Sequence, residues 1–170
     1  MAATLTTKIT FLLSALLQNT VLAQAAQGSV ERSPTFTWPT GTGADKADKI
    51  YTERVTLSAS ATETLDLAGS LVDALGAVCT FVAVKAIILV ADAGNVNNVV
   101  IGGAAGTQFL GPLGDATDKV KVKPGGFLAC IAPDATGWQV GAGSTDFLKI
   151  ANGGGTTSVT FDLIIIGASA

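Results

Sequence analysis

Alternating polar and apolar residues are the dominant pattern of this chain, and residues 115–140 give the clearest example. Lys119, Lys121 and Lys123 are separated by single valines, which is the two-residue period of a half-buried β-strand. The sequence Pro-Gly-Gly at 124–126 then predicts a chain reversal, because proline cannot donate to a strand ladder and glycine tolerates positive φ.

Two further strands are predicted in the same stretch. Residues 127–131 form a continuous apolar run, which is typical of a strand covered on both faces. A turn signal follows at residues 133–137, and a third strand begins at Trp138. Together the three segments predict a compact antiparallel sheet.

Similar runs between turn signals predict strands through the rest of the chain. They cover residues 49–57, 63–67, 80–90, 97–101, 146–150 and 158–166. Because such short strands recur with little sign of helix, we predict an all-β fold, an antiparallel β-sandwich or jelly-roll.

Some pairings can be predicted as well. The strands at 49–57 and 63–67 are expected to form a hairpin, and Asn-Gly at 152–153 predicts a second hairpin turn. The run at 80–90 is expected to be a central strand, with Lys85 reaching a sheet edge or a partner.

The N-terminal region is predicted to be an extended arm and linker over residues 1–40, followed by the β-sandwich domain at 41–170. Alternation from Ile9 to Leu17 favours a strand, although the leucines there also fit one stripe of a helix.

Two shorter segments complete the predicted arm. Residues 24–33 are small and polar and suggest a linker, and residues 34–39 suggest a short edge strand between prolines.

The same region imitates a secretory signal, because Lys8 precedes an apolar stretch that ends in small residues. A single positive charge and the polar residues at 18–20 count against a signal. We therefore expect a structural arm.

Composition changes this picture in one respect. Apolar residues make up 48% of the chain, charged residues make up 14%, and the mean hydropathy is +0.51. These values exclude a disordered protein and favour an apolar surface that is partly covered by other subunits. The alternative is an ordinary β protein rich in alanine, valine and glycine.

Membrane and nucleic-acid partners are not expected. No apolar run reaches the roughly 18 residues of a membrane-spanning helix. The net charge is −3, and the basic residues are dispersed.

Candidate chemistry is sparse. Histidine is absent, so the commonest general base and metal ligand is missing. The nearby carboxylate pairs are expected to be solvated charges; they are Asp45/Asp48, Glu63/Asp66 and Asp115/Asp118.

Metal and disulfide sites are weakly indicated. Asp92, Asn95 and Asn97 offer oxygen ligands, but Asx turns explain them better. Cys79 and Cys130 are expected to be buried free thiols, with a disulfide as the alternative. We predict no enzyme activity, no cofactor and no bound metal.

The lysine row has two interpretations. It places three ammonium groups on one strand face, where lysine protects an edge strand from pairing with other chains. The same row could instead contact an acidic partner surface.

Several segments outside the arm carry a resemblance to known proteins. They are residues 45–69, NVNNVVIGG at 95–103, KPGGFLACIAPDATGW at 123–138, DFLKIAN at 146–152 and SVTFDLIIIG at 158–167. These segments resemble a recurrent small virion-associated protein of tailed bacteriophages and prophages. The resemblance implies a β-sandwich virion component, a capsid decoration (cement) protein, and transfers no catalytic residue.

This resemblance implies specific partners and a location. The partners would be the major capsid protein and further copies of the chain, as a homotrimer. The protein would be made in the host cytoplasm and would lie on the capsid exterior. The candidate contact residues are Phe11, Leu13, Phe36, Trp38, Lys119, Lys121 and Lys123.

Two alternatives stay open. One is a virion protein associated with a head or tail fibre or spike. The other is a secreted carbohydrate-binding module that would stack sugars on Trp138, Tyr51 or Trp38.

Overall fold

The computed structural model describes residues 4–19, 26–69, 71–143 and 145–170. The described residues contain β-strands and no helix. By their internal contacts they separate into an N-terminal unit, residues 6–38, and a sandwich unit that contains residues 39–170.

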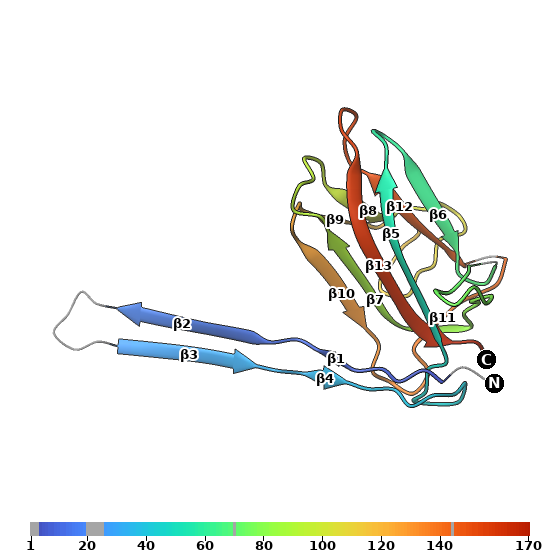
Figure 1. The fold of residues 1–170 in the computed structure, drawn as a ribbon, viewed down its shortest axis with the longest axis horizontal. Helices are drawn as coiled ribbons and strands as arrows, with labels where there is room; N and C mark the ends of the chain where they lie inside the picture. Colours follow the sequence, from blue (N-terminus) through green and yellow to red (C-terminus); the bar gives the residue numbers. More distant parts are fainter. Residues whose placement is uncertain (1–3, 20–25, 70, 144) are drawn as a thin grey trace. The chain divides into compact units, whose positions relative to one another are not determined.

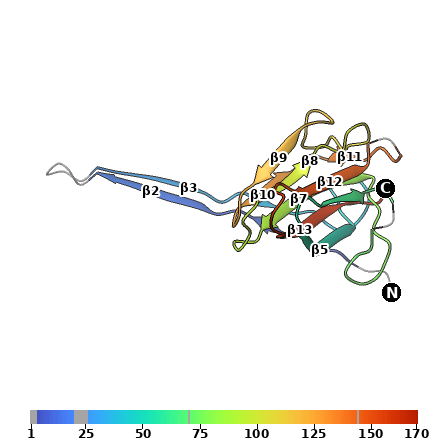
Figure 2. The same cartoon turned by 90° about the horizontal axis from the view of Figure 1, so that it is seen from above.

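Two antiparallel sheets pack against each other in the sandwich unit (Figures 1 and 2). The β13 sheet has the order β10-β7-β13-β5, and β11 also pairs with β7. Its strands are β5 (Lys49–Leu57), β7 (Ala83–Ala91), β10 (Phe127–Ile131), β11 (Trp138–Gln139) and β13 (Val159–Ala168).

The β12 sheet has the order β6-β12-β8-β9. Its strands are β6 (Thr62–Asp66), β8 (Val99–Gly102), β9 (Lys119–Val122) and β12 (Phe147–Asn152). The predicted all-β sandwich is confirmed.

The core lies between these two sheets and follows from the alternation in each strand. On β13, Val159, Phe161, Leu163 and Ile165 are fully buried, while the residues between them point to the opposite face. The β12 sheet contributes alternate residues to the same cluster, such as Leu148.

Strands that are adjacent in sequence often lie in different sheets. The hairpin predicted for β5 and β6 is wrong, because β5 pairs with β13 and β6 pairs with β12. The hairpin predicted at residues 152–153 is also wrong, since β12 and β13 belong to opposite sheets. A turn signal specifies that the chain reverses, but not that the flanking strands pair.

The strands of residues 115–140 are also divided between the two sheets. Its first turn forms as predicted, with Gly125 at a φ of 71°. However, β9 pairs with β8 in one sheet, whereas β10 and β11 both pair with β7 in the other. The three strands therefore do not form a sheet of their own. The expected burial of β10 on both faces is also wrong, because Phe127 is 63% exposed.

Lys85 does not reach a sheet edge or a partner, and that prediction is corrected. The register between β7 and β13 shifts at this point, and Lys85 is 1% exposed. Its ammonium group donates hydrogen bonds of 2.8 Å to the carbonyl oxygens of Asp134 and Ala135. The lysine therefore anchors the turn between β10 and β11 from inside the protein.

The N-terminal unit is an antiparallel ribbon. Its strands are β1 (Ile9–Thr10), β2 (Leu13–Asn19), β3 (Ala26–Arg32) and β4 (Thr35–Phe36). β1 pairs with β4, and β2 pairs with β3. The strand interpretation of this region is confirmed, whereas the linker expected at residues 24–33 is wrong, because most of it forms β3. Its small polar residues gave no alternation to detect.

Asn152 makes several hydrogen bonds to the backbone at the point where the chain passes from the β12 sheet to the β13 sheet. Its amide donates to the carbonyl oxygens of Thr157 and Ser58, at 2.7 and 3.0 Å, and its side-chain oxygen accepts from the amide of Gly154. The side chain is 6% exposed. Its loss would remove these hydrogen bonds together.

We predict that Asn152→Ala lowers the free energy of unfolding by about 2–3 kcal/mol, because it removes three hydrogen bonds of a buried side chain, each of which contributes about 1 kcal/mol. Urea denaturation followed by circular dichroism measures the change. Gln139→Ala is the control: this exposed amide makes one 3.1 Å bond to the Thr136 carbonyl. Equal losses in the two variants would contradict the proposed role of Asn152.

Candidate functional site

Lys119 and Lys121 lie on β9, and Lys123 directly follows it. Among the described strands, β9 pairs with β8 alone. Lys119, Lys121 and Lys123 are exposed, and Val122 between them is buried. All three ammonium groups therefore project from the outer face of the β12 sheet. This position satisfies both the edge-protection and the partner-contact interpretation.

A fourth lysine extends the row inward. Lys149 of β12 lies between Leu148 and Ile150, which are both fully buried, so its side chain points to the outer face. We call Lys119, Lys121, Lys123 and Lys149 the lysine face. Sequence reasoning missed Lys149, because its strand is distant in sequence and joins β9 only through β8.

The backbone beside the row shapes this face. A Cβ placed on Gly103 would lie 2.2 Å from Cε of Lys119, so the lysine stem lies over this glycine. On the outer face of this sheet, the described strands carry a single carboxylate. It belongs to Asp66, on the opposite edge strand β6. It accepts a hydrogen bond from the amide of Ala68. The outward positions of β8 and β9 therefore carry lysines and no carboxylate.

The predicted contact residues of the N-terminal unit differ in exposure. Leu13 is 55% exposed, whereas Phe11 and Phe36 are partly buried. Trp38 is 4% exposed, and its backbone is held by Thr7, whose hydroxyl accepts from the Trp38 amide and donates to its carbonyl. Leu13 is thus the most accessible of the four side chains.

The aromatic residues considered for sugar stacking are not gathered on one surface. Tyr51 and Trp38 are buried, and Trp138 packs partly buried against the core. A stacking platform needs an open ring face. None of these three rings offers one in the described structure.

Two carboxylates approach each other where β5 and β6 form open edges of opposite sheets. Glu53 and Glu63 line a recess of about 410 Å³ with Tyr51, whose hydroxyl donates to Glu53. Burial and the neighbouring Glu53 raise the pKa of Glu63, and burial and the bond to Glu53 raise the pKa of Tyr51. Sequence reasoning missed this pair, because it treated β5 and β6 as a hairpin.

Asp115 and Asp118, one of the carboxylate pairs considered from the sequence, and Asp134 bond within turns. Asp115 accepts from the amide and hydroxyl of Thr117, and Asp134 accepts in the same way from Thr136. Backbone hydrogen bonds lower the pKa of both aspartates. Asp118 accepts from the amide of Asp115.

The oxygen ligands considered for calcium are similarly engaged. Asp92 accepts from the Gly94 amide and pairs with Arg54, while Asn95 bonds to the backbone of Thr160. Among the described residues, no group of three or more histidine, cysteine, aspartate or glutamate side chains could hold a metal ion.

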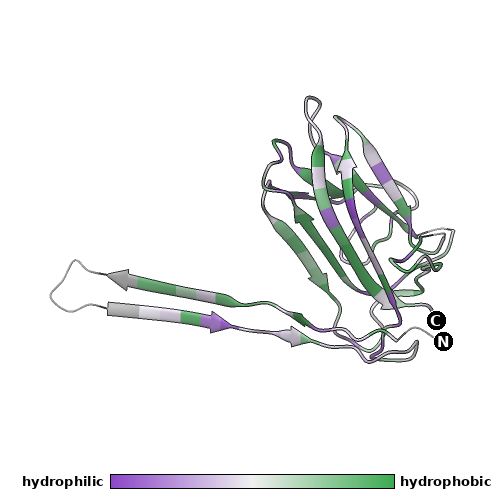
Figure 3. Cartoon of the chain, in the orientation of Figure 1, coloured by the Kyte–Doolittle hydropathy of each residue, from purple (hydrophilic) through white to green (hydrophobic). Residues whose placement is uncertain are grey.

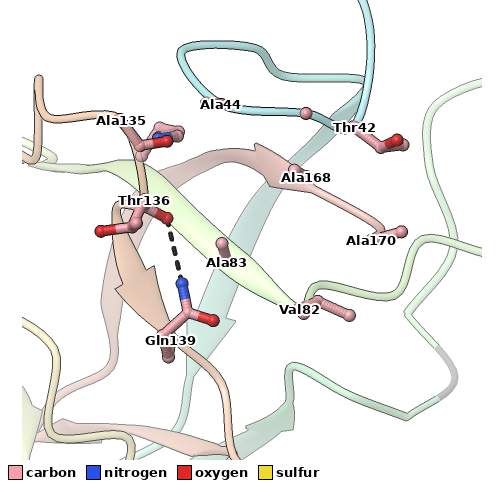
Figure 4. Close-up of a pocket in the computed structure, with 11 residues that line it drawn as sticks. Thr42, Ala44, Val82, Ala83, Ala135, Thr136, Gln139, Ala168 and Ala170 are labelled. Atoms are coloured by element: carbon pink, nitrogen blue, oxygen red, sulfur yellow. Dashed lines mark hydrogen bonds between the residues drawn. The ribbon is translucent and has the colours of Figure 1, made fainter.

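A small hollow of about 190 Å³ lies beside Lys85, at the end of the β13 sheet (Figure 4). Its walls include the methyl groups of Ala83 and Ala168, and its polar groups bond within the protein, as Gln139 does to the Thr136 carbonyl. The hollow has the shape for an apolar group, and the ammonium group of Lys85, which lines it, already bonds to the carbonyl oxygens of Asp134 and Ala135.

Comparison with known proteins gives no relative: no family model, no curated protein and no solved structure matches this chain. The described residues also contain no helix long and apolar enough to cross a membrane.

We predict that Glu63→Gln stabilises the protein at neutral pH. A carboxylic acid whose pKa is raised on folding loses stability as pH rises from the unfolded value through the folded value. The variant removes this loss, so its urea midpoint should exceed that of the wild type at pH 7 and match it at pH 4. Glu31→Gln, on the N-terminal unit, is the control. A lower midpoint for Glu63→Gln at pH 7 would contradict the prediction.

We also predict slow reaction of Cys79 with a thiol reagent. Both cysteines are free, and burial raises the pKa of Cys79 to about 11 from 9.0. This shift lowers the thiolate fraction at pH 8 by roughly a hundredfold. Ellman's reagent, applied to Cys130→Ala in native buffer and in urea, measures the difference. Equal rates in both solvents would refute the prediction.

Proposed function

We propose that this chain is a structural protein of a tailed-bacteriophage virion, which decorates the capsid exterior and stabilises the lattice of the major capsid protein. The observation that carries the proposal is the lysine face, in which three exposed lysines and the partly exposed Lys149 gather on one face of a sheet. The resemblance of five segments of the sandwich unit to virion-associated proteins supports the same function.

The lysine face suits an acidic, regularly repeated partner surface. Lys119, Lys121 and Lys149 lie on strands, and Lys123 directly follows β9, so the sheet sets the spacing of most of these charges and little ordering is needed on binding. Electrostatic complementarity of this kind increases the association rate and sets the orientation of the partner. A capsid lattice presents the same acidic surface many times.

Stabilisation would follow from mass action. A protein that binds the assembled lattice and not its free subunits lowers the free energy of the assembled state. The N-terminal unit would add contacts with neighbouring subunits through exposed residues such as Leu13. In this proposal the decorating species is a homotrimer.

The location in the virion separates the main proposal from its alternative. A protein of a head or tail fibre would share the sandwich and the resemblance, but it would be found in isolated tails or fibres. Mass spectrometry of separated heads and tails, from the phage or prophage that encodes the chain, distinguishes the two.

We predict that the triple variant Lys119→Glu, Lys121→Glu, Lys123→Glu keeps its fold and binds capsids roughly ten- to a hundredfold more weakly at low salt. Each exposed charge pair contributes about 0.2–1 kcal/mol, and reversal replaces attraction by repulsion. Co-sedimentation with purified capsids measures the affinity, and the defect should shrink as salt screens the charges.

A matched control uses single substitutions. Lys121→Glu should weaken binding, whereas Lys46→Glu makes the same charge change at an exposed loop position and should not. If the triple variant binds like the wild type, the lysine face is only a protected sheet edge. If the wild type does not bind capsids at all, the decoration proposal fails.

A further inference from the structure

One face of the β2–β3 hairpin is apolar and exposed. In the register of the hairpin, Ala15 faces Val30 and Leu17 faces Gly28, so these residues share a face with Leu13. Leu13, Leu17 and Val30 are 55%, 79% and 49% exposed. We call Leu13, Ala15, Leu17 and Val30 the hairpin face.

An isolated two-stranded hairpin is marginally stable in water, because it has no core to bury. The opposite face of this hairpin carries Ser14, Ser29 and Glu31, which favour solvent, together with Leu16. The apolar residues of the hairpin face are thus concentrated where a covering surface would stabilise the strands.

The β13 sheet carries a second apolar surface, on the face that points away from the core. Three residues lie in one cross-strand row, Ala129 of β10, Ile88 of β7 and Ile164 of β13. The alternation of these strands places Val90 and Ile131 on the same face. We call Ile88, Val90, Ala129, Ile131 and Ile164 the sheet face. Figure 3 shows these strands as predominantly hydrophobic.

This surface is accessible at one end. Val90 is 40% exposed, and Ile88, Ala129 and Ile164 are partly exposed. Ile166, further along β13 on the same face, is 5% exposed. The open part of the sheet face therefore lies toward Val90.

We propose that the hairpin face of one copy packs on the sheet face of a second copy, so that the protein self-associates by exchanging its N-terminal hairpins. Two apolar strand surfaces packed face to face form the same kind of layer as the sandwich core, with a spacing of about 10 Å. Leucines from the hairpin would fill the space between the branched and small residues of the sheet face.

The charges near Val90 also favour the contact between the hairpin face and the sheet face. Arg32 faces Leu13 in the hairpin register and so lies on the hairpin face. In the row of Val90, Asp162 shares the guanidinium of Arg54 with Asp92, at 2.8 and 2.5 Å. Two carboxylates on one guanidinium leave an excess negative charge, which a second arginine at the rim of the sheet face would balance.

The available area suits a reciprocal exchange. Each hairpin strand has seven residues. Such a hairpin is about 24 Å long and about 10 Å wide, so one contact removes roughly 450–500 Å² from water, counting both surfaces. Each copy takes part in two such contacts, one through its hairpin face and one through its sheet face, and together these remove roughly 900–1,000 Å² from water.

The partner proposed for the hairpin face is a second copy of the same chain. Every copy carries both the hairpin face and the sheet face, so one kind of contact can be repeated until a closed, symmetric assembly forms. This inference concerns self-association and does not depend on capsid binding, and it is tested without capsids.

The first experiment measures mass in solution by sedimentation equilibrium. The wild type should be larger than the 17.0 kDa of one chain. The double variant Leu13→Thr, Leu17→Thr should weaken association at least tenfold, since threonine keeps strand propensity but buries less apolar surface. Ile88→Thr combined with Val90→Thr should do the same from the receiving side.

A matched control removes two leucines from elsewhere on the same unit. Leu12 and Leu16 are 71% and 58% exposed, and Leu16 lies on the opposite hairpin face. Leu12→Thr with Leu16→Thr should leave the mass unchanged. Equal dissociation by both double variants, or a wild type that is monomeric at all concentrations, would overturn the proposal.

A second experiment separates exchange between copies from contact within one copy. A benzoylphenylalanine at position 17 is photocrosslinked after equal amounts of ¹⁵N-labelled and unlabelled protein are refolded together. Mixed-label crosslinks to peptides of β7 or β10 are expected. Crosslinks that join only peptides of the same label, or that map elsewhere, would overturn the proposal.

Discussion

The packing of β13 against the opposite sheet is the interaction on which the rest of the structure depends. This strand runs between β7 and β5, and its inward residues Phe161 and Leu163 are fully buried in the core. Because both neighbours of β13 take their register from it, the outer face of the sheet is also determined by this strand. A shift of one residue in the register of β13 would turn each of its side chains to the other face of the sheet.

The two outer faces of the sandwich differ in chemistry. One carries the lysine face, and the other carries the partly exposed sheet face of valine, isoleucine and alanine. A solvent-facing strand usually alternates apolar with polar residues, so apolar residues on both faces of β7 and β10 are unusual for an uncovered sheet. The lysine face and the sheet face therefore lie on opposite outer faces of the sandwich.

Polar side chains stabilise the turns that carry the chain between sheets. Asn152, Asp115 and Asp134 each bond to nearby backbone amides, and Lys85 holds the turn after β10. These hydrogen bonds give several of the carboxylate and amide residues a structural function in turns. The pair Glu53 and Glu63 is different, because it arises from two sheet edges and has no local structural function in a turn.

The sequence by itself determined the all-β class and most strands of the sandwich unit, because alternation and turn residues act over a few neighbouring positions. It did not reveal β3, whose small polar residues do not alternate with apolar ones. It also placed Lys119, Lys121 and Lys123 on one strand face. Only the tertiary structure decided which strands pair, since pairing depends on burial shared by residues far apart in sequence. For that reason the separation of β5 and β6 into opposite sheets, the addition of Lys149 to the lysine face and the internal position of Lys85 could not be derived from the chain alone.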